Sequence, residues 1–170
     1  MNYGGLGQVL GHEIMHAYDV AAMSTDYLNR RVDLGKSPTM ELHAAKVLCL
    51  RSSYQKAESL SRARTTDDNT DSEGVADYAG LLLAYAAYRR TYDDQQRAFM
   101  PRLTHEQAFF VSHCLKWCSG AKGTRSSEHE RYWHSRSRCI VPLQNMPEFA
   151  KAFSCREGDL MNPKDRCRFW

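Results

Sequence analysis

The strongest constraint on the fold is the pattern H-E-x-x-H, formed here by His12, Glu13 and His16. Residues four apart lie on the same face of an α-helix, so these two imidazoles can bind one metal ion if the segment is helical. The pattern sits within the apolar residues 9–17, which is typical of a buried helix. We therefore predict a helix over residues 3–18 that carries two ligands of a metal site.

The glutamate of the pattern indicates what the metal site does. Glu13 directly follows His12 and cannot reach the same ion in the same way, but it can take a proton from a water bound to that ion. This arrangement is typical of zinc peptidases. The alternative is a chance pair of core histidines, yet residue frequencies give this pattern in roughly one chain of this length per hundred or fewer. Two buried imidazoles would also need polar partners. The pattern thus favours one zinc ion.

A third protein ligand must come from elsewhere, because a peptidase zinc has three such ligands and one open position. The extended pattern H-E-x-x-H-x-x-G-x-x-H is absent, since Asp19 and Ala22 occupy the positions of its Gly and last His. Glu73 and Asp77 lie four apart on an otherwise apolar helical segment. Burying two carboxylates is costly without a cation or hydrogen-bond donors. We predict Glu73 as the third ligand, on a second helix as in thermolysin-like enzymes.

Two further carboxylates are candidates for orienting the histidine ligands. Asp77 can accept a hydrogen bond from one ligating His, which sets its tautomer and raises its basicity. Asp19, three residues after His16, can do the same for the other His. The alternatives are an acidic pair near a helix start, favoured by the helix dipole, for Glu73 and Asp77, and a surface position near a helix end for Asp19.

Helical periodicity dominates the rest of the sequence and predicts a mainly α fold. Helix starts are indicated by Ser37 before a proline, by Ser72, and by the capping-box spacing of Thr104 and Gln107. The best strand candidate is residues 139–141, and residues 62–71 are typical of a polar loop. The further helices that we predict cover residues 37–50, 73–92, 104–117 and 147–153.

Composition narrows the class of protein. The 170 residues suit one domain. The net charge of only +3 does not indicate binding to nucleic acid or to a membrane surface. No stretch is long and apolar enough for a transmembrane helix. Six cysteines without a C-x-x-C pair indicate disulfides in an oxidising compartment rather than a cysteine-bound zinc. Because the first residues lack a signal peptide, we expect that Met1 is not the true start of the polypeptide.

Several motifs together resemble the neprilysin and endothelin-converting-enzyme family of zinc metallopeptidases. Residues 2–7 precede the H-E-x-x-H pattern as in that family, and Glu73 and Asp77 match its E-x-x-x-D motif. The similarity covers essentially the whole chain. The matching tail comprises Leu143-Gln144-Asn145, Glu148-Phe149, Ala152-Phe153, Met161-Asn162-Pro163 and the terminal Cys167-Arg168-Phe169-Trp170.

The resemblance implies a metalloendopeptidase that hydrolyses short peptides, usually before an apolar residue. It implies one zinc ion bound by His12, His16 and Glu73, with Glu13 as the general base. The fold that it implies is the C-terminal portion of a larger catalytic lobe, with thermolysin-like helices around the metal and stabilising disulfides. Residues 1–170 would form this zinc-binding part.

Three further roles are implied by the same resemblance. Asp77 matches a carboxylate that is often labelled a proton donor. His134 aligns with a His that stabilises the oxyanion during attack on the peptide carbonyl, and Arg138 with an Arg that holds a substrate backbone carbonyl. Zinc and an imidazolium would then share the developing charge while a guanidinium sets the register.

Members of this family are normally single-pass, outward-facing membrane proteins several times longer. The resemblance therefore implies an extracellular or cell-surface location, although no signal or anchor is present in this chain. It also implies an upstream half that completes the substrate chamber and supplies an N-A-x-x motif. The expected partners are this upstream half and peptide substrates.

The family pattern also assigns the cysteines. It implies a disulfide between Cys49 and Cys167, and partners upstream of this chain for Cys118 and Cys155. The remaining two, Cys114 and Cys139, are not family positions and can pair with each other.

Departures from the family pattern support two other interpretations. The loop between His134 and Arg138 is two residues shorter than usual, and residues 17–20 and 27–35 diverge. These differences favour a secreted peptide-binding homologue that retains zinc but is catalytically weak or inactive. The intact Glu13 favours the enzyme. A third interpretation, a partial gene model or an isolated domain without an independent role, rests on the missing export signal.

Overall fold

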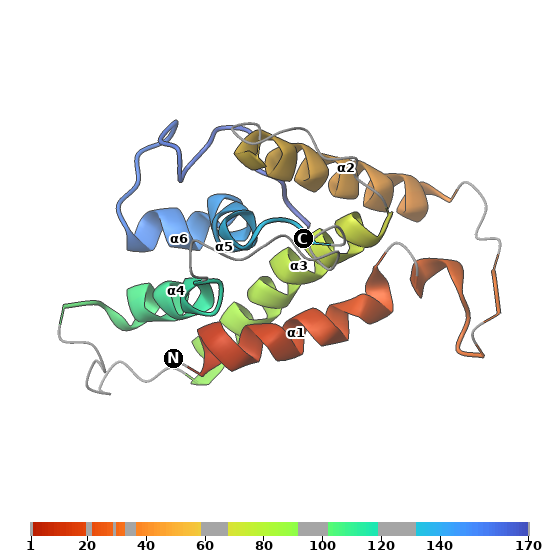
Figure 1. Ribbon diagram of the computed structural model, residues 1–170, viewed down its shortest axis with the longest axis horizontal. Coiled ribbons are helices and arrows are strands. Elements are labelled where there is room, and N and C mark those ends of the chain that lie inside the picture. Colours follow the sequence, from red (N-terminus) through yellow and green to blue (C-terminus); the bar gives the residue numbers. More distant parts are fainter. Residues whose placement is uncertain are drawn as a thin grey trace, which may run out of the picture.

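The computed structural model is a bundle of helices packed around one long central helix (Figure 1). It describes residues 2–19, 22–28, 30–32, 37–58, 68–91, 102–118 and 132–169. Within these ranges there is no β-strand, only an isolated bridge between Thr25 and Arg31. The α-helices are α1 (Gln8–Met15), α2 (Pro38–Glu58), α3 (Asp68–Thr91), α4 (His105–Leu115), α5 (Ser135–Gln144) and α6 (Pro147–Ala152). A π-helical turn, Tyr3–Gly7, leads into α1, and 3₁₀ turns follow at His16–Tyr18 and Ala22–Ser24.

The contact between α1 and α3 is made by two glycines and sets the position of the metal-binding pattern. A Cβ atom added to Gly80 would lie 2.4 Å from the backbone nitrogen of His12, and one added to Gly11 would lie 2.5 Å from the Gly80 carbonyl oxygen. Only residues without a side chain allow two backbones to approach this closely. The helices lie side by side in Figure 1, so groups on α1 reach α3 over a short span.

The core lies on the other sides of α3, where aromatic residues of α2, α4 and α6 pack together with Trp133, which precedes α5. Tyr54 of α2 is fully buried and stacks on Trp133, with ring centroids 4.8 Å apart. Phe109 and Phe110 of α4 contact each other edge to face, and Phe110 also meets Phe149 of α6. Such aromatic contacts contribute large buried areas with defined geometry. They hold the helices that border the site.

Two disulfides tie distant segments together. Cys49 of α2 is bonded to Cys167, the pairing that the resemblance implied, and Cys114 of α4 is bonded to Cys139 of α5. Within the described residues, Cys118 and Cys155 have no disulfide partner. Stable disulfides are typical of proteins in oxidising compartments.

Two helix starts were predicted correctly from capping residues. The Ser37 hydroxyl accepts a hydrogen bond from the backbone nitrogen of Met40 at 3.3 Å, at the start of α2. Thr104 and Gln107 form the reciprocal capping box at the start of α4, with bonds of 3.0 and 3.1 Å. These interactions are local in sequence, which is why the pattern reveals them.

Other predictions about the helices were wrong. Residues 139–141 lie within α5 rather than in a strand, where the Cys139 disulfide and the buried Val141 hold them against neighbouring helices. Helix α3 begins at Asp68 instead of Glu73. The additional turn carries Asp71, which accepts bonds from Arg51 Nε of α2 at 2.9 and 3.0 Å. Tertiary contacts thus override the weak local signal in both places.

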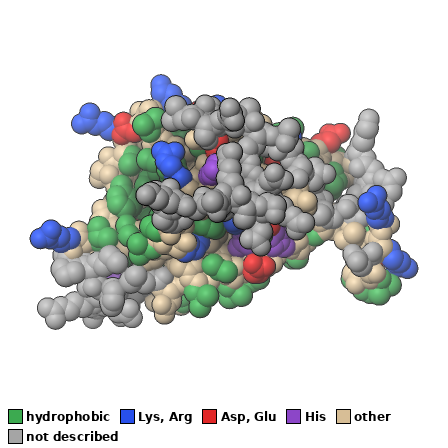
Figure 2. All heavy atoms as spheres, viewed as in Figure 1, with side chains coloured by type: hydrophobic (Ala, Val, Ile, Leu, Met, Phe, Trp, Pro, Cys, Tyr) green, Lys and Arg blue, Asp and Glu red, His purple; other side chains and the backbone are tan. Residues whose placement is uncertain are grey.

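The first helix is also less buried than its apolar sequence predicted. Leu6, Leu10 and Ile14 are 75%, 62% and 50% exposed, while Met15 on the other face is 5% exposed. In Figure 2, hydrophobic side chains accordingly reach the surface over this region. No described helix is both long and apolar enough to cross a bilayer. The predicted loop before residue 68, the end of the predicted helix at Tyr92, and Trp170 lie outside the described residues.

Candidate active site

His12 is the buried member of the histidine pair. It lies on α1, and its Nδ1 is 2.9 Å from Oδ1 of Asp77 on α3. An ionised carboxylate only accepts hydrogen bonds, so Nδ1 carries the proton. In the neutral imidazole, Nε2 then presents a lone pair. Asp77 thereby orients His12 and sets its tautomer, as the spacing of the two carboxylates predicted.

His16 is oriented in the same way by a different carboxylate. Its Nδ1 is 2.9 Å from Oδ2 of Asp19, whose Oδ1 accepts the backbone N–H of Ala22, also at 2.9 Å. Asp19 is 6% exposed and is therefore no surface residue. Its position at the end of the helical run lets the chain turn back and present the carboxylate to the ring. His16 Nε2 is consequently also left with a lone pair.

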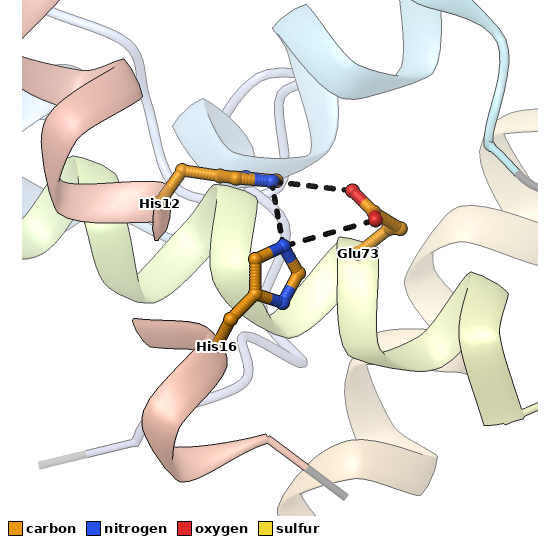
Figure 3. A group of neighbouring side chains, drawn as sticks. All are labelled: His12, His16 and Glu73. Carbon is orange, nitrogen blue, oxygen red and sulfur yellow. Dashed lines mark hydrogen bonds and ion pairs between the residues drawn. The ribbon is translucent and has the colours of Figure 1, made fainter. Parts of the chain in front are cut away.

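The free nitrogens of both histidines and the carboxylate of Glu73 converge on one point (Figure 3). His12 Nε2 and His16 Nε2 are 3.1 Å apart, His12 Nε2 is 3.2 Å from Glu73 Oε2, and His16 Nε2 is 3.7 Å from Glu73 Oε1. Ligands of a tetrahedral zinc ion with bonds of about 2.0–2.1 Å lie about 3.3 Å from one another. The three side chains therefore have the spacing of a tetrahedral site with one position left open.

The charges of the site also suit a cation. Glu73 Oε2 is buried and lies 3.2 Å from His12 Nε2, so a carboxylate and the Nε2 atoms of both histidines face one another. Burial lowers the pKa of His12, but the hydrogen bonds to Asp77 and Glu73 outweigh burial and raise this pKa to about 9. In the absence of a metal, the site thus holds a proton tightly. A divalent cation would occupy the same favourable position.

The Asp77 carboxylate connects three helices, because Asp77 lies on α3 and binds one residue of α1 and one of α5. Besides His12, it binds Arg138 of α5, with Nε 2.6 Å from Oδ2 and Nη2 2.9 Å from Oδ1. Burial raises the pKa of Asp77, but His12 and Arg138 outweigh it and keep this pKa below its ordinary value. Asp77 is fully buried and therefore ionised only because of these two partners.

Arg138 lies beside the metal-binding cluster in a fixed position. Its guanidinium stacks over the rings of Trp117, at 4.2 Å, and Tyr132, at 4.8 Å, and its Nη2 is 3.6 Å from Glu73 Oε2. Planar guanidinium groups combine such stacking with bidentate binding of carboxylates. The shorter loop before Arg138 therefore does not displace it from the site.

Glu13 and His134 lie further out than the ligands. Glu13 is exposed on α1, one position after His12. His134 caps the start of α5, with its backbone nitrogen 2.8 Å from Oε1 of the buried Glu58. Its imidazole is exposed and forms no hydrogen bond or ion pair with His12, His16 or Glu73 among the described residues. The structure brings the three predicted zinc ligands together with Asp19, Asp77 and Arg138. His134 is not part of this group.

Sequence reasoning missed two polar residues that border the site. Gln8 lies one helical turn before His12 and is 1% exposed, and its Nε2 donates to the Asp77 carbonyl oxygen at 3.2 Å. Its spacing of four from His12 could have revealed it. Lys116 follows α4, and its amine donates to Gln8 Oε1. No local pattern links Lys116 to the site, because the two contacting residues are 108 positions apart.

Comparison with known proteins agrees with this geometry. The model of Peptidase family M13 matches residues 1–169. The chain belongs to Peptidase family M13. Neprilysin-3 of Drosophila melanogaster is 35% identical over the whole chain, which covers 22% of that protein. Human membrane metallo-endopeptidase-like 1 is 30% identical, again over the whole chain and 23% of its own length. The chain thus spans about a quarter of the curated relatives that it matches.

Solved structures show the same fold. A zinc metalloprotease of Mycobacterium tuberculosis, solved with an inhibitor, superposes with a TM-score of 0.80 and 26% identity over 99% of this chain and 27% of its own. A Haemonchus galactose-containing glycoprotein complex gives a TM-score of 0.81 at 28% identity, over 99% of this chain and 30% of the other. The chain therefore shares the mainly helical fold of a zinc metalloprotease and contains two disulfides.

Proposed function

We propose that this chain forms the zinc-binding part of a metalloendopeptidase that hydrolyses short peptides, with His12, His16 and Glu73 as the zinc ligands. The observation that carries the proposal is the convergence of two Nε2 lone pairs and a buried carboxylate at separations of 3.1–3.7 Å. Such a group of acceptors favours the binding of a shared cation. One zinc ion is bound per chain.

The residues around the ligands have separate tasks in this mechanism. A bound zinc ion would supply a polarised peptide carbonyl and an acidic water molecule. Glu13, exposed beside His12, would accept the proton of that water. Asp77 and Asp19 hold the two imidazoles with Nε2 directed inward, and Asp77 additionally holds Arg138.

Substrate positioning falls to the side of the site formed by α5. Arg138 has donor groups next to Glu73 and can bind a backbone carbonyl of the peptide while it stays anchored on Asp77. His134 lies at the start of the same helix and stabilises the oxyanion once substrate has closed the distance.

We also infer that the active enzyme includes an upstream half, since the relatives are about four times longer than this chain. The exposed apolar stripe of Leu6, Leu10 and Ile14 provides a surface for it to cover. Cys118 and Cys155, unpaired in the structure, are available for bonds to that half. The two disulfides support an extracellular or cell-surface location.

A second candidate function is peptide binding without efficient hydrolysis. The position of His134 favours this candidate, because its imidazole forms no hydrogen bond or ion pair with the three proposed zinc ligands among the described residues. A protein that retains zinc and Arg138 but lacks oxyanion stabilisation would bind peptides and cleave them slowly.

Metal analysis and peptide cleavage together test both candidates. The purified, oxidised protein should bind one zinc ion and, together with the upstream half, cleave a quenched fluorescent peptide, whereas the Glu13→Gln variant should keep the zinc and lose cleavage. Zinc binding without cleavage by the parent protein would favour the peptide-binding candidate. Failure to bind stoichiometric zinc would exclude the proposed ligand set.

A further inference from the structure

Lys116 is a partly buried cation that the peptidase mechanism does not use. Its amine donates to Gln8 Oε1, lies 3.2 Å from His113 Nδ1, and is 5.2 Å from the centroid of the Trp117 ring. All three partners are neutral. Among the described residues, no carboxylate lies within ion-pair distance of this amine.

The charged groups nearest Lys116 are one carboxylate, Asp77, and one guanidinium, Arg138, and neither forms an ion pair with its amine among the described residues. Burial lowers the pKa of Lys116 to about 8, Asp77 opposes this effect, and Arg138 adds to it. Asp77 cannot serve as a direct partner, since both of its oxygens are bound by His12 and Arg138. A lysine with this pKa is still mainly charged at neutral pH. A cation held out of water without a counter-charge favours the binding of an anion.

Lys116 is also close to the reacting centre. Gln8, whose Oε1 accepts a hydrogen bond from Lys116, lies one turn before His12 on the same face of α1 and donates to the Asp77 carbonyl. The Lys116 amine and the Arg138 guanidinium both lie over the Trp117 ring. The amine thus shares the Trp117 ring with Arg138, the residue proposed to hold the substrate.

We propose that Lys116 is a specificity-determining residue that binds a carboxylate of the peptide substrate next to the scissile bond. This inference rests on the proposed peptidase function and changes its specificity. The family resemblance implied cleavage before an apolar residue, whereas a cation and an amide here select an acidic group. The carboxylate is either an Asp or Glu side chain or the free C-terminus of a short peptide, since both offer the same chemistry to an ammonium.

Binding measurements with matched peptides test the assignment without relying on turnover. The zinc-loaded Glu13→Gln protein is titrated with the fluorophore-labelled, amidated peptide Gly-Phe-Xaa-Ala-Gly, in which Xaa is Asp, Asn or Leu. A fourth peptide ends in a free carboxylate directly after Leu. The Asp peptide should bind about 10-fold or more tightly than the isosteric Asn peptide, as for other charge-assisted hydrogen bonds. Tighter binding of the fourth peptide than of its amidated form would identify the C-terminal carboxylate as the ligand.

Variants then separate the charge of Lys116 from its packing. In the same Glu13→Gln background, Lys116→Met should abolish the preference for Asp over Asn while zinc content stays stoichiometric. Lys116→Glu should reverse the preference toward a peptide with Lys at Xaa. Lys151→Met, which removes an exposed lysine on α6, is the matched control and should leave the preference unchanged.

Two results would overturn the assignment in different ways. Equal binding of the Asp and Asn peptides by the zinc-loaded parent, together with equal binding of the fourth peptide and its amidated form, or an unchanged preference in Lys116→Met, would exclude Lys116 alone and leave the peptidase function standing. Absence of binding by every peptide would exclude both proposals.

Discussion

The helix pair α1 and α3 and the wall formed by α4 and α5 border the same site, but they are held in place by different means. The backbones of α1 and α3 touch at Gly11 and Gly80, and the ligand atoms they carry are at most 3.7 Å apart. On the wall, the long side chains of Lys116 and Arg138 reach inward from segments that a disulfide connects. Metal binding thus depends on direct backbone contact, and substrate selection on extended side chains.

The largest effect is expected from a change at the backbone contact. In Gly80→Ala, the new Cβ would meet the His12 backbone nitrogen at 2.4 Å, so the helices must separate and the ligands with them. We expect a loss of more than about 3 kcal/mol in unfolding free energy, together with loss of stoichiometric zinc. Denaturant unfolding and metal analysis measure both.

Gly5→Ala is the matched control, because its Cβ would have its nearest neighbour at 3.9 Å. It should change the unfolding free energy by less than about 1 kcal/mol. Zinc content close to that of the parent in Gly80→Ala would show that the backbone contact does not position the ligands.

The next largest effect concerns the two carboxylates that orient the histidines. Asp77→Asn removes the charge that holds both His12 and Arg138, whereas Asp19→Asn affects His16 alone. Loss of such hydrogen-bond partners typically lowers metal affinity about 10–100-fold. We expect Asp77→Asn near the upper end of that range and Asp19→Asn near the lower end in competition titrations with a zinc chelator. A larger loss of zinc affinity in Asp19→Asn than in Asp77→Asn would mean that the carboxylate on α3 is not the more important of the two.

The wall should show its own dependence on pH. Burial lowers the pKa of His113 on α4 to about 3, from 6.5 in the unfolded chain. The unfolded state therefore binds more protons below pH 6.5, so this contribution to stability is complete above pH 6.5 and is lost progressively toward pH 3. The slope is up to about 1.4 kcal/mol per pH unit. In denaturant unfolding at pH 6.5, 5.5 and 4.5, the unfolding free energy of His113→Leu should fall less steeply with pH than that of the parent. Equal slopes would show that His113 does not cause the pH dependence.

The smallest effect tests whether the wall can be weakened without disturbing the metal site. Thr104→Ala removes the capping box of α4, whose hydroxyl bond to Gln107 is 3.1 Å long. Loss of such a cap costs about 1 kcal/mol. Thermal unfolding should detect this loss while zinc affinity stays unchanged. A parallel drop in zinc affinity would show that the two regions are energetically coupled.

The sequence predicts interactions between residues close along the chain better than the contacts between helices. The capping box at Thr104 and the pairing of Asp19 with His16 span three residues and were both recognised. Residues 139–141, by contrast, were assigned to a strand, because the disulfide and packing that keep them helical involve α4. The exposure of Leu10 and Ile14 was missed for a similar reason, since an apolar sequence does not show which face is covered.

By itself, the sequence determined the chemical identity of the site. Spacings of four place His12 with His16, and Glu73 with Asp77, on shared helix faces wherever these helices lie. Only the tertiary structure decided how the two faces meet, through the contact of Gly11 with Gly80 across 69 positions of chain. It also decided that Arg138 is anchored on Asp77 and that Lys116 reaches Gln8. Helical periodicity is a property of the local backbone, whereas these contacts depend on how closely distant backbones can pack.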